Sequence, residues 1–156
     1  MNRPTWNKIC MDLAKSIAKR STCSNPNRQV GCVITDEQHT RVLAWGYNGV
    51  AMGEQHQCEY LGNSVNGEKT EHGYTCSCVH AEMNCIVKLD TTDPCEKIMY
   101  LTLSPCMICA RMIINAGIKT VYCLENYRDT SPISLLVKCG VRVFHCPDEK
   151  TWYIYT

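Results

Sequence analysis

Two segments that the sequence predicts to be helical begin with reactive residues. Between them they carry three side chains of the kinds that bind metals and one carboxylate. His80 and Glu82 belong to the stretch HAE, and Cys106 and Cys109 follow Pro105 in the stretch PCMIC. Two cysteines three positions apart place their sulfurs on one side of a helical turn. The positive end of the helix dipole favours thiolate over thiol. We therefore expect these two cysteines and His80 to hold Zn²⁺ with a fourth coordination position left open.

Glu82 is expected to act as a general acid–base group rather than as a metal ligand. Zinc lowers the pKa of a bound water to about 7, and a carboxylate beside that water can take up its proton and return it. His80 and Glu82 are two positions apart and would diverge in the middle of a helix. At a helix start, both can approach one cavity.

Each motif alone has simpler explanations. A surface histidine and glutamate share this spacing by chance in many helices, and a C-x-x-C pair also serves redox chemistry or half of a structural zinc site. Together, H-x-E and P-C-x-x-C resemble the signature of the zinc-dependent deaminases of nucleobases. The combination predicts attack on C4 of a cytosine ring with loss of ammonia.

Size and charge favour a small ligand. The chain has 156 residues, 45% of them hydrophobic, with 16 basic against 15 acidic side chains and a net charge of +1. This balance argues against a polynucleotide partner, which requires an excess of cations. The sequence shows no apolar run of membrane-spanning length and no signal-like N-terminus, so we expect a soluble, cytoplasmic protein without membrane contact.

Thirteen cysteines in a chain without a secretion signal favour metal binding or catalysis over a disulfide framework. Four of them lie in apolar segments and are predicted to be small core residues: Cys32, Cys85, Cys123 and Cys139.

Hydrophobic periodicity predicts alternating helices and strands. Helices are expected after Thr5 with Ile9, Leu13 and Ile17 recurring at helical spacing, and over 80–89, 105–116 and 131–139. Strands are expected over 30–35, 42–47, 97–103, 120–124 and 141–146. This order predicts one domain over 1–156 with a three-layer α/β/α architecture and a mixed five-stranded sheet. A Cys/His-rich insertion at about 50–79 interrupts the pattern.

Several stretches make the chain similar to the deoxycytidylate (dCMP) deaminase family over nearly its whole length. They are RSTC from Arg20, RQVG from Arg28, GYNG from Gly46, HAEMN from His80, YLTLSPCMICARMIINAGIKTVYC from Tyr100, and Tyr127. The resemblance implies a cytidine-deaminase-like fold and zinc-dependent conversion of dCMP to dUMP. It also implies that Asn48 contacts sugar and phosphate, that Arg28 binds the 5′-phosphate and that Tyr127 stacks near the pyrimidine.

The same resemblance implies further ligands. Some family members carry a structural zinc, for which Cys23, Cys58, His72 and either Cys76 or Cys78 are the candidates here. Gly46, Tyr47, Asn48 and Gly49 match a loop that binds dCTP as activator or dTTP as inhibitor with Mg²⁺, and family members assemble into hexamers. Alternatives at this stage are a deaminase of another free base, nucleoside or tRNA, or an inactive zinc-stabilised binding module.

Overall fold

The computed structural model describes residues 3–23, 28–54, 78–90, 92–127, 129–146 and 150–156. The described helices are α1 (Trp6–Ala18), α3 (Ala81–Ile86), α4 (Met107–Asn115) and α5 (Ser131–Lys138). The strands are β1 (Gly31–Asp36), β2 (Val42–Tyr47), β3 (Lys97–Leu103), β4 (Thr120–Glu125), β5 (Arg142–His145) and β6 (Tyr153–Ile154). Of the predicted insertion, residues 55–77 lie outside the described residues.

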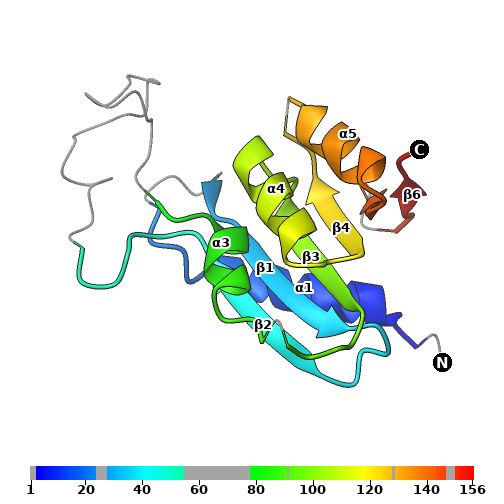
Figure 1. Cartoon of the computed structure of the whole chain (residues 1–156). Coiled ribbons are helices and arrows are strands. Elements are labelled where there is room, and N and C mark those ends of the chain that lie inside the picture. Colours follow the sequence, from blue (N-terminus) through cyan, green and yellow to red (C-terminus); the bar gives the residue numbers. More distant parts are fainter. Residues whose placement is uncertain (1–2, 24–27, 55–77, 91, 128, 147–149) are drawn as a thin grey trace.

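The strands form one mixed sheet in the order β2-β1-β3-β4-β5-β6. β1 is antiparallel to both β2 and β3, whereas β3, β4 and β5 run parallel to one another. Helix α1 covers one face, and α3, α4 and α5 cover the other (Figure 1). The predicted three-layer architecture is confirmed. Over the described residues, the sheet has six strands rather than five, because β6 adds two residues antiparallel to β5, too few for a periodic pattern to reveal.

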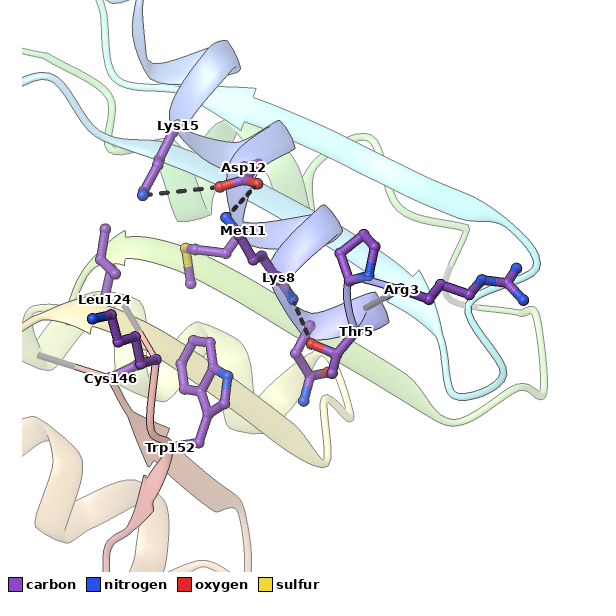
Figure 2. Close-up of a pocket in the computed structure, with 12 residues that line it drawn as sticks. Arg3, Thr5, Lys8, Met11, Asp12, Lys15, Leu124, Cys146 and Trp152 are labelled. Atoms are coloured by element: carbon purple, nitrogen blue, oxygen red, sulfur yellow. Dashed lines mark hydrogen bonds and ion pairs between the residues drawn. The ribbon is translucent and has the colours of Figure 1, made fainter. Parts of the chain in front are cut away.

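Helix α1 packs on the sheet through small side chains. Its buried residues are Cys10, Met11, Ala14 and Ala18. A Cβ on Gly31 would lie 2.0 Å from the Ala14 carbonyl oxygen, so the helix and β1 touch through their backbones. Of the apolar residues that recur at helical spacing, Ile9 and Leu13 are 42% and 38% exposed, whereas Ile17 packs against the core. Close contact between the backbones of α1 and β1 leaves room for alanine and glycine rather than for large side chains. Figure 2 shows Met11 directed from α1 toward Trp152.

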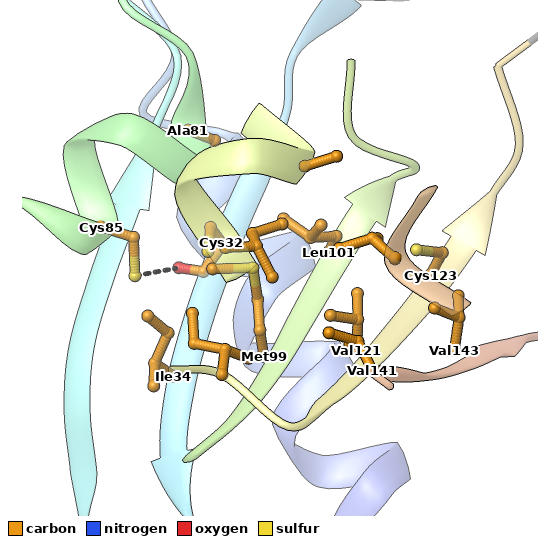
Figure 3. Packing of buried hydrophobic residues seen from close by; sticks show 14 of the residues in the cluster. Cys32, Ile34, Ala81, Cys85, Met99, Leu101, Val121, Cys123, Val141 and Val143 are labelled. Atoms are coloured by element: carbon orange, nitrogen blue, oxygen red, sulfur yellow. Dashed lines mark hydrogen bonds between the residues drawn. The ribbon is translucent and has the colours of Figure 1, made fainter. Parts of the chain in front are cut away.

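The opposite face carries the larger core. Side chains of β1, β3, β4 and β5 pack there against α3, α4 and α5 (Figure 3). Cys32, Cys85 and Cys123 are fully buried in this cluster, as predicted. Cys139 is exposed instead, because it is the C-cap of α5 and lies beyond the buried turns of that helix.

The ends of the elements follow local rules. Thr5 caps α1 by accepting a hydrogen bond from the Lys8 amide, and Gly117 and Gly140 follow α4 and α5 with positive φ. Two predicted helix starts were early, since His80 and Cys106 are N-caps in extended conformation. Pro105 therefore precedes α4 rather than opening it. Within the described residues, the helices are too short or too polar to cross a membrane.

Candidate active site

His80, Cys106 and Cys109 meet at the carboxyl end of β3. The His80 Nδ1 atom lies 3.5 Å from the Cys106 sulfur and 3.4 Å from the Cys109 sulfur. All three ligand atoms lie within 4.8 Å of one another. Zn–N and Zn–S bonds of about 2.1 Å and 2.3 Å in tetrahedral geometry would place nitrogen and sulfur roughly 3.6 Å apart. The three side chains therefore fit a zinc ion without rearrangement.

The positions of these residues explain how one cavity receives side chains from two helices. His80 and Cys106 are N-caps, and neither side chain makes a capping hydrogen bond. Their extended backbones turn both side chains away from their own helices, while Cys109 lies one turn into α4. His80 and Glu82 thus share the cavity although they are two positions apart, because only Glu82 has helical geometry.

The two sulfurs shift each other's pKa in opposite directions. Side-chain hydrogen bonds from Cys109 and then from His80 lower the pKa of Cys106 to about 3. The same hydrogen bond with Cys106, together with burial, raises the pKa of Cys109. The Cys106 sulfur thus favours the thiolate form, and a metal cation bound between the two sulfurs would stabilise both thiolates.

Glu82 forms the inner wall of the site. It is only 4% exposed, and burial is the main cause that raises the pKa of its carboxyl group. A side-chain hydrogen bond with Cys109 and the charge of His80 act in the opposite direction. A buried carboxylate beside metal ligands, with its pKa moved toward neutrality, has the properties of a group that both accepts and returns protons.

A cavity of about 290 Å³ opens in front of Glu82. Its lining unites the three residues that the sequence assigned to substrate, Arg28, Asn48 and Tyr127, with His80 and Cys106. Tyr127 is 57% exposed at the mouth, and Arg28 is exposed as well. Residues from five separate stretches of the chain therefore face one space of ligand size.

Both polar atoms of the Asn48 side chain form hydrogen bonds within the protein. Its Oδ1 accepts hydrogen bonds from Ser21 Oγ and the Val30 amide, both at 2.8 Å, and its Nδ2 donates to the Arg28 carbonyl at 2.8 Å. An asparagine side chain can make four such bonds. Among the described residues, the second N–H of Asn48 has no hydrogen-bond partner, and two of the other three bonds hold the segment that carries Arg28.

Two serines in this region had no role assigned from the sequence. Ser21 contacts both the Asn48 side chain and its carbonyl, and its Oγ also accepts from the Cys23 amide. Ser104 is buried in the cavity lining, and its Oγ accepts a hydrogen bond from the Tyr127 amide at 2.7 Å. Ser21 lies within the stretch RSTC and Ser104 directly precedes Pro105 of the stretch PCMIC, and these positions were the available signal.

The GYNG segment is packed tightly from two sides. A Cβ on Gly46 would lie 2.6 Å from the Ala81 carbonyl oxygen, so this glycine lets β2 touch the start of α3. Gly49 exchanges two backbone hydrogen bonds with Val79, and Asn84 donates to the Tyr47 carbonyl. The contact with Ala81 accounts for Gly46 by packing, while the assignment of this segment to an allosteric nucleotide stays a prediction.

The predicted second zinc site falls largely outside the described residues, since Cys58, His72 and Cys76 belong to 55–77. Cys23 is buried, and together with the alternative ligand Cys78 it lines the catalytic cavity. Over the described ranges, the only cluster of three metal-binding side chains is His80, Cys106 and Cys109.

A mixed sheet between helical layers, with a His–Cys–Cys cluster and a buried glutamate at its strand ends, defines a zinc-dependent deaminase of the nucleobase type. Residues 4–125 match the family model described as the cytidine and deoxycytidylate deaminase zinc-binding region. The chain belongs to this family.

Similar proteins agree with this assignment. ComE operon protein 2 of Bacillus subtilis is 36% identical over 92% of this chain and 72% of its own length. The deoxycytidylate deaminase of Saccharomyces cerevisiae is 33% identical over 90% of this chain, which spans only 45% of the yeast protein. The crystal structure of the dCMP deaminase of cyanophage S-TIM5 in complex with dCMP and dUMP superposes with a TM-score of 0.72 at 28% identity, covering 93% of this chain and 99% of the phage chain.

Proposed function

We propose that this protein is a zinc-dependent deaminase that hydrolyses dCMP to dUMP and ammonia. The observation that carries the proposal is the buried Glu82 beside His80, Cys106 and Cys109 in a cavity of about 290 Å³. Family membership supports the reaction class, and the phage relative solved with dCMP and dUMP supports the substrate.

His80, Cys106 and Cys109 would hold the metal through one nitrogen and two sulfurs. When bound, zinc lowers the pKa of water and so supplies a nucleophile at neutral pH. Two thiolates balance the charge of the divalent ion, and the partly buried position of the cluster limits competition from solvent. The exposed side of His80 faces the cavity, which leaves room for substrate next to the metal ligands.

Glu82 would carry the protons of the reaction. Its carboxylate accepts a proton from the attacking water and delivers it to N3 of the cytosine ring as the C4–O bond forms. It then takes the second proton from the new C4 hydroxyl and passes it to the C4 amino group, so that the C4–N bond breaks, the C4 carbonyl forms, and ammonia and uracil result. Burial of Glu82 keeps bulk water away from this transfer, and its raised pKa makes both directions accessible.

Substrate recognition would come from the outer part of the cavity. The guanidinium of Arg28 suits the 5′-phosphate, since a planar fork of donors matches phosphate oxygens. The remaining N–H of Asn48 would donate to the sugar, and Tyr127 would pack its ring near the pyrimidine. These roles follow from the family resemblance, and the shared cavity lining supports them.

We further propose that GYNG mediates regulation by dCTP and dTTP with Mg²⁺ in a homo-hexamer, and that a structural zinc binds Cys23 with Cys58, His72 and Cys76 or Cys78. Asn48 of this segment lines the cavity, and Gly46 contacts the start of α3. A ligand bound to the segment could therefore change the geometry of the active site. Saturation curves for dCMP with and without each triphosphate test this, and curves that neither nucleotide moves would refute it.

The proposed reaction is tested by measuring ammonia release from dCMP, CMP, deoxycytidine and dCTP with zinc content determined in the same sample. We expect dCMP to give the highest kcat/KM in protein that contains zinc. Greater activity on deoxycytidine or on CMP would reassign the substrate. Zinc-loaded protein without activity on any of the four would contradict the proposed function.

A further inference from the structure

Tyr127 stands at the mouth of the catalytic cavity and is held there through its backbone. The residue lines the cavity and is 57% exposed. Within the described ranges, its hydrogen bonding is limited to the main-chain N–H, which donates to Ser104 Oγ at 2.7 Å. An aromatic ring without a partner of its own takes its position from the chain that carries it. The groups that fix the backbone around Tyr127 therefore decide where this ring can reach.

Ser104 fixes this backbone from the end of β3. Its own N–H donates to the Glu125 carbonyl at 2.8 Å, while its Oγ accepts from the Tyr127 N–H. Ser104 is only 5% exposed, so solvent cannot readily replace either bond. Since Ser104 stands two positions before the metal ligand Cys106, the two bonds tie the mouth of the cavity to the segment that carries the zinc site.

A second support comes from the C-terminal strands. The Asn126 side chain donates to His145 Nδ1 at 3.3 Å and to the Tyr155 hydroxyl. His145 also forms a hydrogen bond with the Leu124 backbone, and its ring stacks with that of Tyr155 at a centroid distance of 6.2 Å. His145 is the last residue of β5, and Tyr155 directly follows β6. The sheet edge opposite β2 thus holds the residue that directly precedes Tyr127.

We propose that Ser104 and His145 are positioning residues, which together place the ring of Tyr127 against the bound pyrimidine. The pairing of β4 with its neighbours ends at Glu125, so the bonds to Asn126 and Tyr127 lie beyond the sheet ladder and act on the cavity wall. His145 does not line the cavity, so it acts on a ligand only through the chain. The inference rests on the proposed function, because it gives a purpose to the contact between Tyr127 and a nucleotide.

The test is a pair of double-mutant cycles on the full-length, zinc-loaded protein, measured as KM and kcat for dCMP and as Kd for dUMP. Ser104→Ala and His145→Ala should each raise KM and Kd about three- to tenfold, the scale of one lost hydrogen bond, with kcat nearly unchanged. In a Tyr127→Ala background, neither change should add more than about twofold, because effects that pass through one shared residue are not additive.

Two further variants separate positioning from a general loss of structure. His145→Asn should restore the KM of the parent protein, because its Oδ1 can replace Nδ1 as the acceptor for Asn126. Ser134→Ala, at an exposed position of α5, is the matched control and should change neither constant. Where Ser104→Ala lowers the melting temperature, the cycle of His145 decides alone.

Undiminished effects of both alanine changes in the Tyr127→Ala background would overturn the proposal, because the two residues would then act elsewhere. Unchanged KM and Kd in both single variants would overturn it as well. A parent protein that binds dUMP but does not turn over dCMP would contradict the proposed function alone, since the cycles in Kd would still decide the positioning role. A parent protein that binds no dUMP would overturn both.

Discussion

The two cavities of this protein take their polar and charged side chains from different kinds of location in the fold. The catalytic cavity takes its reactive side chains from strand ends and helix starts, where the backbone conformation fixes their direction. The second cavity is a groove of about 520 Å³ between α1 and the chain around Trp152, and it takes its charges from long lysines on the surface. The catalytic cavity is rigid because contacts with the sheet and the helices hold each of its residues. The lysines of the groove can be substituted with little effect on the fold. Substitutions should therefore have very different consequences in the two places.

The largest effect is expected for Glu82→Gln. The amide keeps the size of the buried side chain but cannot accept and return a proton, so kcat for dCMP should fall by about 10²- to 10⁴-fold. Zinc content and melting temperature should stay near those of the parent protein. Glu37→Gln, an exposed glutamate of the β1–β2 turn, is the control. Near-normal turnover by the Glu82 variant would remove the proposed mechanism.

Gly46→Ala should destabilise the fold and disturb the site together. The added Cβ would meet the Ala81 carbonyl oxygen at 2.6 Å and the Cys85 amide at 2.7 Å, and neither backbone atom can rotate away. We expect a loss of about 1–3 kcal/mol in the free energy of unfolding, measured by denaturant titration.

Gly49→Ala is the matched comparison for Gly46, because its Cβ would meet only the Thr22 side chain, with Oγ1 at 2.7 Å. That side chain can move, so its variant should lose clearly less stability. Equal losses at both positions would show that the contact with α3 does not decide the role of Gly46.

Ser21→Ala should act on substrate binding rather than on chemistry. It removes contacts to Asn48 and Cys23, and a typical hydrogen bond contributes about 0.5–1.5 kcal/mol. If Asn48 and the Arg28 segment bind dCMP, KM should rise about two- to tenfold with kcat nearly unchanged. Ser134→Ala, at an exposed position of α5, is the control. An equal fall in kcat with constant KM would argue against this positioning role.

The smallest effect is expected for Lys8→Gln. Its ion pair with Asp12 is exposed on both sides, and such pairs contribute about 0–1 kcal/mol. The melting temperature should change little, and kcat and KM for dCMP should not change. A large loss of either would mean that the groove and the catalytic cavity are not the independent regions described above.

The sequence by itself predicted which residues form the site, because their types and their spacing are local properties of two short segments. HAE and PCMIC predicted the cluster of His80, Cys106 and Cys109 beside Glu82, and alternating periodicity predicted the order of the helices and strands. Local capping residues also mark the helix ends: Thr5 caps the start of α1, and Gly117 follows the end of α4 with positive φ.

Only the tertiary structure decided how distant segments meet. The exposure of Ile9 and Leu13 depends on how closely α1 approaches Gly31, and the environment of Cys139 depends on where α5 ends. The hydrogen bonds of Asn48 with Ser21 and Val30, and the groove between α1 and Trp152, join residues far apart in the chain. A pattern within one segment cannot encode them, because they arise when separate elements pack against one another.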